Sequence, residues 1–410
     1  MKNVLIKSPL VACLFGLSIN AANANDLYKE MGITKPEQEA IMSAINSARE
    51  ISKRAEQYNG LPYRRDAHAK ATGCARATFS VNPGIPERFK AGLFAQDNHQ
   101  YQAWIRFSNG DMLVQADSKG DARGMAVKVM NVPGKAIAPE LGESHNQDFI
   151  MTNTPAFFNR NIFDYADDMT YLAKFQRTKW FISLFPPRLH PKQFYRAIQT
   201  VSSVIDTPLE AQYFSMLPYR LGHNTIKFST KPCAGMTFPK NVDKSNPDYL
   251  STQLETQLAN GGACFEFMVQ EKLPGYYMPV DDATAIWSEK ASPFITIATI
   301  NIPPQHLYSE QQQQFCENIS MNPWRAVEGW EPISSLNKAR RVVYQAVSKY
   351  RHQQNKAATP EPNSWCLAED GESCDPQQGL VVSKPTWPLP RCFDRYAEPI
   401  DGESLNSNCK

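Results

Sequence analysis

The chain of 410 residues has almost no excess charge and lacks the sequence patterns of several common protein classes. Its 43 Lys and Arg residues nearly balance its 41 Asp and Glu residues, so the net charge of +2 provides no basic surface for nucleic acid. No apolar run is long enough to span a membrane, and no internal repeat is visible. The cysteines form no Cys-x-x-Cys pair and no Cys/His cluster at zinc spacing. These absences argue against a nucleic-acid-binding protein, a membrane-spanning protein, a repeat protein and a zinc-stabilised fold.

The N-terminus has the three parts of a secretory signal peptide. Lysines flank the start of an apolar run at residues 10–19, and residues 22–24 read Ala-Asn-Ala, a small-x-small cleavage site. We therefore expect a signal peptide over residues 1–24 and export, with the bacterial periplasm as the compartment. A lipobox-like Leu-Val-Ala-Cys ending at Cys13 is an alternative, but its apolar run is short. Lipid attachment is therefore the less favoured expectation.

Export changes what the cysteines are expected to do. Eight cysteines follow the signal peptide, namely Cys74, Cys233, Cys264, Cys316, Cys366, Cys374, Cys392 and Cys409. An even number of cysteines in an oxidising compartment predicts up to four disulfides. Four of these cysteines lie in residues 356–410, where Pro, Ser, Asn and Gly are frequent and apolar periodicity is weak. This segment is predicted to be an irregular, Cys/Pro-rich C-terminal extension wrapped on a main domain at residues 25–355.

Between these ends, hydrophobic periodicity predicts both helices and strands. Residues 35–57 and 335–354 are expected to be amphipathic helices, and residues 159–205 are expected to be mostly helical, with a break at Pro186 and Pro187. Strand-like runs occur at residues 75–81, 101–107, 125–132, 148–152, 225–230, 264–270 and 294–300. Seven or eight strands with clustered helices predict an α+β fold built on an antiparallel β-barrel of about eight strands, with surrounding helices.

The predicted closing helix has an unusual face. At helical spacing, Arg340, Tyr344 and Arg351 lie on one side, at offsets of four and seven residues. A cation close to a phenol favours its ionised, metal-binding form, and tyrosine is one of the axial ligands used for haem iron. An amphipathic helix with an ordinary tyrosine is the plainer alternative. Taken alone, this short motif does not distinguish the two interpretations.

A haem enzyme that handles peroxide also needs an acid–base group opposite its axial ligand. Histidine suits this task because it can take a proton from one peroxide oxygen and return it to the other. His68 is the candidate among seven histidines, and it follows Arg65 by three residues. A solvent-exposed loop histidine is the alternative, so the choice of His68 depends on further sequence evidence.

Six short blocks occur in order along the chain between residues 65 and 344. They read Arg-Asp-Ala-His-Ala-Lys at residues 65–70, Trp-Ile-Arg-Phe-Ser-Asn at 104–109, Asp-Ala-Arg-Gly-Met-Ala-Val-Lys at 121–128, Asn-Thr-Pro-Ala-Phe-Phe at 153–158, Gln-Tyr-Phe and Pro-Tyr-Arg-Leu-Gly within 212–222, and Arg-x-x-x-Tyr at 340–344. One block is weak evidence, but six in order are specific. The chain therefore resembles the haem catalase superfamily, and within it the small branch of catalase-related peroxidases.

The resemblance implies a bound haem b and assigns residues to its two faces. Tyr344 would be the axial ligand of the ferric iron, with Arg340 as its charge partner. On the opposite face, His68 would be the acid–base group, and Ser108 would lie beside it. A bound NADPH is not implied, because the long helical end of the full catalases has no counterpart in this sequence.

Further roles follow from the same resemblance. Arg65, Arg106 and Arg351 would bind the two haem propionates, because arginine forms paired hydrogen bonds with carboxylates. Phe157 would line the pocket or its channel, although core packing explains a phenylalanine equally well. Asp121 would lie along the path of the substrate.

The chain departs from the haem catalases beside this site. Those proteins have two consecutive asparagines before Thr-Pro, the first of which faces the peroxide, whereas here Thr152 stands at that position and only Asn153 remains. Neighbours in a strand point to opposite faces. Either Thr152 replaces the asparagine, or a local shift brings Asn153 into the site, so both are kept as expected catalytic residues.

These residues predict a haem-dependent, catalase-related peroxidase that breaks down hydrogen peroxide or small organic hydroperoxides, with an electron donor of unknown identity. A hydroperoxide isomerase or lyase of the allene oxide synthase type is one alternative. A haem-binding protein without turnover is the other. The segments through which full catalases assemble are short here, so a monomer or dimer is expected.

Overall fold

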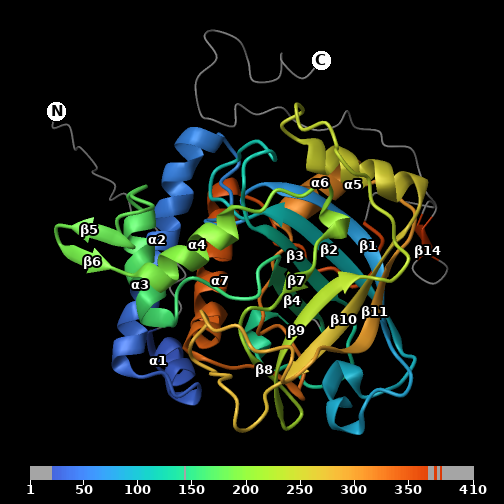
Figure 1. Cartoon of the computed structure of the whole chain (residues 1–410), viewed down its shortest axis with the longest axis horizontal. Helices are drawn as coiled ribbons and strands as arrows, with labels where there is room; N and C mark the ends of the chain where they lie inside the picture. Colours follow the sequence, from blue (N-terminus) through green and yellow to red (C-terminus); the bar gives the residue numbers. More distant parts are fainter. Residues whose placement is uncertain (1–20, 143–144, 368–373, 376–378, 381–410) are drawn as a thin grey trace, which may run out of the picture.

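Ten strands form one antiparallel sheet at the centre of the computed structural model (Figure 1). The strands are β1 (Ala71–Val81), β2 (Gln100–Asn109), β3 (Arg123–Val129), β4 (Gln147–Thr152), β7 (Tyr213–Phe214), β8 (Tyr219–Leu221), β9 (Asn224–Pro232), β10 (Ala263–Glu271), β11 (Ile295–Ile302) and β12 (Trp330–Pro332). Their order is β10-β11-β1-β2-β3-β4-β7-β9-β8-β12, and β10 also pairs with β9. This extra pairing closes the first eight strands of that order into a barrel, which confirms the predicted fold class.

The structure describes residues 21–142, 145–367, 374–375 and 379–380. The predicted signal peptide therefore lies almost wholly outside the described residues, and so does most of the predicted extension. The start of the extension is described and packs on the main domain. The Trp365 indole donates a hydrogen bond to the Ala77 carbonyl at 2.8 Å, and Glu361 forms an ion pair with Lys128 at 2.9 Å.

Aromatic side chains fill the inside of the barrel. Phe149 lies at the centre, with ring centroids 4.8 Å from Phe267, 5.1 Å from Trp330 and 5.4 Å from Phe228. These side chains are fully or almost fully buried. Because successive strand residues point to opposite faces, the barrel interior takes one half of each strand and leaves the other half for the helices outside.

Three helices cover the outer face of the strands that carry the candidate site. They are α2 (Lys35–Asn59), α3 (Ile162–Leu172) and α7 (Ser335–Asn355), and they share one apolar cluster. The helices predicted at residues 35–57 and 335–354 correspond to α2 and α7. At the start of α7, the Ser334 hydroxyl accepts a hydrogen bond from the Asn337 backbone N–H at 3.3 Å.

The region predicted to be mostly helical contains a β-hairpin, and here the sequence-based expectation was wrong. The strands β5 (Ile182–Leu184) and β6 (Pro187–Leu189) lie between α3 and α4 (Pro191–Val201). Proline lacks a backbone N–H and disfavours helical geometry in the residue before it. Pro186 and Pro187 therefore do more than interrupt a helix, because they occupy the turn and the start of the second strand.

The remaining elements were not predicted. The helices are α1 (Ala21–Glu30), α5 (Tyr249–Asn260) and α6 (Glu310–Asn318), and the short strands are β13 (Cys374–Asp375) and β14 (Gly379–Leu380). Four 3₁₀ turns occur at Glu87–Phe89, Gly92–Phe94, Pro139–Leu141 and Pro208–Glu210. Among the described helices, none combines the length and apolar character needed to cross a membrane.

Two disulfides are defined within the described part of the chain. Cys74 on β1 is joined to Cys316 on α6, across 242 residues of sequence, and Cys233 is joined to Cys264 across 31. Cys366 is also disulfide-bonded. The prediction that the cysteines form disulfides is therefore compatible with the structure, and one of the bridges lies beside the candidate site.

Candidate functional site

The α7 wall of the site consists of a phenol and a cation held together on one helix face. The Arg340 guanidinium carbon lies 4.9 Å from the centre of the Tyr344 ring. Arg340 Nη1 also donates hydrogen bonds to the Tyr219 hydroxyl at 3.3 Å and to Asn337 Oδ1 at 3.1 Å. Burial tends to lower the pKa of Arg340, but interactions with the Tyr344 and Tyr219 phenols outweigh it and raise that pKa. Arg340 is therefore a fixed cation beside Tyr344.

His68 occupies the opposite wall, in the loop that leads into β1. Its backbone has a φ of 57°, a left-handed conformation that few non-glycine residues adopt. The backbone N–H donates to the Gly110 carbonyl at 2.9 Å, and the carbonyl accepts from Arg106 Nη2 at 3.0 Å. These two hydrogen bonds hold the unusual backbone, while Nδ1 of the ring lies 3.0 Å from the Ser108 hydroxyl oxygen.

The surroundings of His68 favour its neutral form. Burial is the main reason that its pKa is lowered to about 4, and the positive charges of Arg106, Arg65 and Arg340 lower it further. An imidazole with this pKa carries no charge at neutral pH. It therefore has one ring nitrogen available to accept a proton.

A glycine makes room for the imidazole. A Cβ atom at Gly124 on β3 would lie 2.6 Å from His68 Nδ1 and 2.7 Å from the Ser108 hydroxyl oxygen, too close for any side chain. The register of the sheet places Ser108, Gly124 and Thr152 directly opposite one another on β2, β3 and β4. The His68 ring therefore lies over the strand that carries the smallest residue in this row.

Tyr344 and His68 line the same cavity, which lies between α7 and the outer face of β2, β3 and β4. The cavity encloses about 920 Å³, including the part that is open to solvent. Its apolar surface includes Ile150, Val343 and Val347. Polar groups thus lie on opposite sides of a largely apolar space, which is typical of ligand and cofactor sites.

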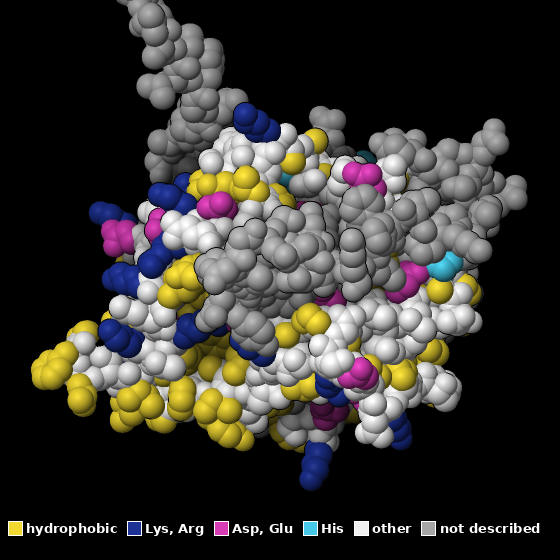
Figure 2. Space-filling model, turned by 90° about the horizontal axis from the view of Figure 1, so that it is seen from above, with side chains coloured by type: hydrophobic (Ala, Val, Ile, Leu, Met, Phe, Trp, Pro, Cys, Tyr) yellow, Lys and Arg dark blue, Asp and Glu magenta, His cyan; other side chains and the backbone are white. Residues whose placement is uncertain are grey.

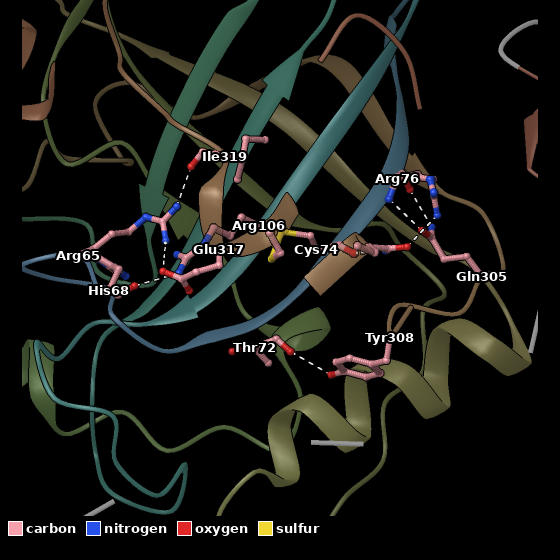
Figure 3. Close-up of a disulfide and its surroundings, with 12 residues drawn as sticks. Arg65, His68, Thr72, Cys74, Arg76, Arg106, Gln305, Tyr308, Glu317 and Ile319 are labelled. Atoms are coloured by element: carbon pink, nitrogen blue, oxygen red, sulfur yellow. Dashed lines mark hydrogen bonds and ion pairs between the residues drawn. A yellow bond between two sulfur atoms is a disulfide. The ribbon is translucent and has the colours of Figure 1, made fainter. Parts of the chain in front are cut away.

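Arginines gather at one end of this cavity around a single carboxylate (Figure 3). Glu317 lies at ion-pair distance from Arg64 and Arg65, at 3.5 Å each, and from Arg351, at 3.4 Å. Arg106 is the fourth arginine, and its side chain is only 4% exposed. Even when Asp66, which also lines the cavity, is counted beside Glu317, the four cations outnumber two carboxylates and leave an excess of buried positive charge.

The pKa values of this cluster show the same excess. Burial, followed by the charges of neighbouring arginines, lowers the pKa of Arg351 to about 9 and that of Arg106 well below its usual range. Burial alone would raise the pKa of Glu317, but the arginines outweigh it and lower that pKa. Within the described residues, Arg106 Nε is buried and makes no hydrogen bond, and Arg65 Nη1 makes only the 3.5 Å ion pair with Glu317. The cluster can therefore bind further carboxylate groups.

These donors fit the haem that the sequence predicts. A phenol with a fixed cation lies on one wall, a neutral imidazole lies on the other, and the space between them is largely apolar. The buried arginines at one end, among them Arg106, whose Nε makes no hydrogen bond with any described residue, match the carboxylates of a haem. The structure thus brings His68, Ser108, Arg65, Arg106, Arg351 and Tyr344 to one cavity.

The two candidates for the missing asparagine are placed differently. Thr152 is on the same face of the sheet as Ser108, and its hydroxyl lies 3.2 Å from the Thr154 hydroxyl oxygen. The Asn153 amide is engaged elsewhere, because it accepts from the Arg123 backbone N–H at 2.7 Å and donates to the Ser203 hydroxyl at 2.8 Å. Of the two residues, Thr152 is therefore the one that lies on the sheet face covered by His68. Neither Thr152 nor Asn153 is among the described residues that line the cavity.

Two further predicted residues lie outside the immediate cavity wall. Phe157 packs against Phe158, with ring centroids 4.5 Å apart, and against Tyr165 at 6.2 Å. Tyr165 does line the cavity, so Phe157 supports its wall from behind. Asp121 is buried and accepts a hydrogen bond from the Asp111 backbone at 3.0 Å, and burial raises its pKa to about 6.

The structure adds residues that the sequence did not reveal. Asp66 and Tyr165 line the cavity, and burial raises the pKa of Asp66 to about 6. Glu317 organises the arginine cluster, and Cys316 immediately before it is tied to Cys74. Nothing in the local sequence around Glu317 marks it as a partner of arginines that lie far earlier in the chain. Arg65 also donates a hydrogen bond to the Ile319 carbonyl, across 254 residues of sequence, so only the fold brings these segments together.

Comparison with known protein families gives a consistent result. A family model for catalases matches residues 54–178, which include His68, Arg106 and Ser108. A catalase of the Onchocerca volvulus endobacterium is 24% identical over 392 residues, which cover 82% of this chain and 76% of that protein. Catalase T of Saccharomyces cerevisiae is 26% identical over 348 residues, which cover 75% of this chain but only 58% of the yeast protein.

Solved structures show a similar fold. Catalase A from Saccharomyces cerevisiae superposes with a TM-score of 0.58 at 18% identity, covering 82% of this chain and 76% of the yeast chain. A fungal catalase also superposes with a TM-score of 0.58, at 15% identity, and covers 98% of this chain and 78% of the fungal chain. At such low identity, the structural similarity concerns the fold alone.

Proposed function

Because the chain belongs to the haem catalase superfamily, we propose that it is a haem-dependent, catalase-related peroxidase. Its substrates are hydrogen peroxide or small organic hydroperoxides. The observation that carries this proposal is the cavity that places a neutral His68 opposite Tyr344, with a surplus of buried arginine charge at one end. These are the groups that a haem-dependent peroxide reaction requires of the protein.

When bound, the haem supplies the iron and the redox chemistry, and the protein supplies ligands and proton transfer. Tyr344 is the residue that would hold the iron, as a phenolate that Arg340 stabilises by its charge. Arg65, Arg106 and Arg351 would hold the carboxylates of the cofactor. In this proposal, Glu317 offsets part of the arginine charge in the haem-free protein.

His68 carries the proton transfer. Its neutral ring would accept a proton from one oxygen of the peroxide and deliver it to the other, which would leave as water from hydrogen peroxide or as an alcohol from an organic hydroperoxide. The remaining oxygen atom and the two electrons that the cleavage requires belong to the redox chemistry that the haem supplies when bound. The Ser108 hydroxyl beside Nδ1 orients the ring, and Gly124 provides the space in which the ring lies. The hydrogen bonds of the His68 backbone to Gly110 and Arg106 help to position the ring for these transfers.

The test combines an absorbance spectrum with a peroxide assay. The purified protein should show a ferric haem spectrum and should consume hydrogen peroxide or an organic hydroperoxide. In His68→Ala the haem spectrum should remain, while peroxide turnover should fall by roughly 100-fold or more. His145→Ala is the matched control, because His145 is exposed and its ring forms a hydrogen bond only with the Gly134 carbonyl among the described residues. Full turnover in His68→Ala would refute the assignment of His68.

One observation keeps a second function in view. Asn153 is hydrogen-bonded away from the cavity, and a threonine takes the place of the asparagine that faces the peroxide in the catalases. A hydroperoxide isomerase or lyase would use the same haem and would release no oxygen from hydrogen peroxide. A spectrum that stays unchanged with every peroxide, in the presence of bound haem, would instead identify a haem-binding protein without turnover.

We also propose that the protein is exported, to the periplasm of a bacterium. The signal-peptide pattern at residues 1–24 supports this proposal, and so do the Cys74–Cys316 and Cys233–Cys264 disulfides, because such bonds persist in oxidising compartments. Fractionation of cells that express the full chain would test it. Recovery of the uncleaved protein in the cytoplasm would contradict it.

A further inference from the structure

The segment from Tyr171 to Ile205 differs in composition from the rest of the chain. It contains six Lys and Arg residues and no Asp or Glu, although the whole protein has 43 basic and 41 acidic residues. The segment includes the hairpin of β5 and β6 and the helix α4. A basic segment of this kind marks a candidate surface for an anionic partner.

The same segment carries more than half of the large apolar side chains that are exposed to solvent in the described part of the chain. Eight of the fifteen exposed large hydrophobic residues of the described chain belong to it: Ile182, Leu184, Phe185, Leu189, Tyr195, Ile198, Val201 and Val204. At the hairpin tip, Leu184 is 84% exposed and Phe185 is 91% exposed. A contiguous patch of this kind marks an interaction surface.

The hairpin projects from the body of the protein. In Figure 1 β5 and β6 extend beyond α3 at the left edge, away from the barrel. Figure 2 shows hydrophobic side chains gathered along the same edge of the molecule, at the lower left, with Lys and Arg side chains beside them. The most exposed apolar residues are therefore also among the most peripheral.

The base of the hairpin is held by packing and polar contacts, so the exposure of its tip is a feature of the fold. The Trp180 ring stacks on His190 with centroids 4.5 Å apart, and the Trp180 N–H donates to the Asp167 carboxylate at 3.0 Å. Arg188 pairs with the same carboxylate. Phe181 packs between Phe158 and Phe194, at 6.1 and 5.6 Å. The base is therefore packed like a hydrophobic core, whereas the apolar side chains at the tip are exposed to solvent.

Three of the six basic residues pair with carboxylates from other segments. Arg177 pairs with Asp111, Arg188 with Asp167, and Lys192 with Asp282. The other three, Lys174, Lys179 and Arg196, form no ion pair with any residue that the structure describes. In the sequence, these cations lie on both sides of the apolar tip. Lys174 and Lys179 are exposed and Arg196 is half-buried, so the two lysines in particular are accessible to an anionic surface.

We propose that the β5–β6 hairpin and α4 form a docking surface for a lipid bilayer that carries anionic headgroups. Leu184 and Phe185 would enter the boundary between headgroups and acyl chains, and the exposed face of α4 would lie along it. Lys174, Lys179 and Arg196 would contact the headgroups, where each basic residue adds to the attraction. The inference is independent of the function proposed for the cavity.

A second copy of the chain fits this surface less well. Most dimers are symmetric, so each copy would present the same patch to its partner. The basic residues that flank one hairpin would then face those of the other, and like charges in contact oppose association. An anionic bilayer satisfies both the apolar tip and the surrounding charge.

Vesicle flotation with the purified full-length protein tests the proposal. The protein should float with vesicles of phosphatidylcholine that contain about 30% phosphatidylglycerol, and much less with phosphatidylcholine alone. Leu184→Ser with Phe185→Ser should weaken binding by roughly tenfold or more, since two large apolar side chains no longer enter the bilayer. Lys179→Glu with Arg196→Glu should weaken binding to the anionic vesicles specifically.

Matched controls separate this surface from general stickiness. Leu61→Ser changes another strongly exposed leucine, at 69% exposure, and Lys290→Glu changes an exposed lysine outside the segment. Both should bind vesicles as the unchanged protein does, and circular dichroism should show the same fold for all variants. The proposal is overturned if the unchanged protein does not float with anionic vesicles. It is also overturned if the tip variant still floats, or if that variant only converts a dimer to a monomer in sedimentation velocity.

Discussion

The two walls of the cavity are built in different ways. The Tyr344 wall comes from a single helix, where Arg340 and Tyr344 are one turn apart and meet because of helical spacing alone. The His68 wall is assembled from the loop before β1, from β2 and β3, and from the end of α6. One wall depends on local geometry, and the other depends on the correct closure of the barrel. Substitutions in the first wall should therefore remove the cofactor, whereas those in the second should mainly alter its reactivity.

The largest effect is expected from Tyr344→Phe. Loss of the phenol oxygen removes the predicted iron ligand, so the ferric haem spectrum should disappear and haem affinity should fall by roughly 100-fold or more. Haem titration followed by absorbance measures this. Tyr350→Phe on the same helix is the control and should change neither value, because Tyr350 does not line the cavity. An unchanged spectrum in Tyr344→Phe would disprove the axial assignment.

Gly124→Ala should separate the two walls. The new methyl group would lie 2.6 Å from His68 Nδ1, so the ring or Ser108 must move. Peroxide turnover should fall by roughly tenfold or more, because small displacements of a proton-transfer group are costly. The ferric haem spectrum should remain, since Tyr344 is untouched. Gly261→Ala is the control, because no atom lies within 4 Å of a Cβ at that position. Normal turnover in Gly124→Ala would show that the glycine is not needed to seat His68.

Glu317→Gln tests the charge excess of the second wall. The variant keeps the shape of the side chain but leaves the arginines without their anion, so the haem-free protein should lose roughly 3 kcal/mol of unfolding free energy. Haem affinity should rise, because the carboxylates of the cofactor become the main anions of the cluster. Urea unfolding and haem titration measure the two quantities. Lower haem affinity would instead mean that Glu317 is needed to align the arginines.

A surface pair provides the comparison for Glu317. Glu331 forms an ion pair with Arg220 at 2.7 Å, but both side chains are largely exposed, at 44% and 51%. Exposed pairs contribute little because water and salt screen them. Glu331→Gln should therefore change the unfolding free energy by less than about 1 kcal/mol and should leave haem affinity unchanged.

The last prediction concerns a pH dependence that His68 confers on stability. Its pKa is lowered to about 4 in the folded protein, from about 6.5 in the unfolded chain. Between these values the unfolded chain binds more protons, so this contribution is fully present above about pH 6.5 and is lost as the pH falls towards 4. His68→Gln should remove this part of the slope, measured by urea unfolding at several pH values. An identical slope in the variant would contradict the lowered pKa.

The barrel and its main helices could be predicted from local patterns. Runs such as residues 75–81 and 148–152 alternate between the barrel interior and the outer face, and their strands β1 and β4 extend them by only a few residues. The hairpin at β5 and β6 could not be predicted. Its exposed apolar residues resemble a helical segment, and only the two prolines show that the chain turns there.

Residue spacing along the chain was enough to identify Tyr344 with Arg340 as a candidate pair, because a helix brings neighbours at four residues together wherever it lies. The choice of His68 and of the propionate-binding arginines depended instead on the resemblance of six ordered sequence blocks to the haem catalases. The tertiary structure determines which groups form hydrogen bonds and ion pairs with these residues. Three features depend on contacts between segments far apart in sequence. They are the ion pairs of Glu317 with the arginines, the space that Gly124 leaves for the His68 ring, and the hydrogen bond of the Asn153 side chain to Ser203. Such contacts exist only after the barrel closes, because its register alone determines which side chains meet.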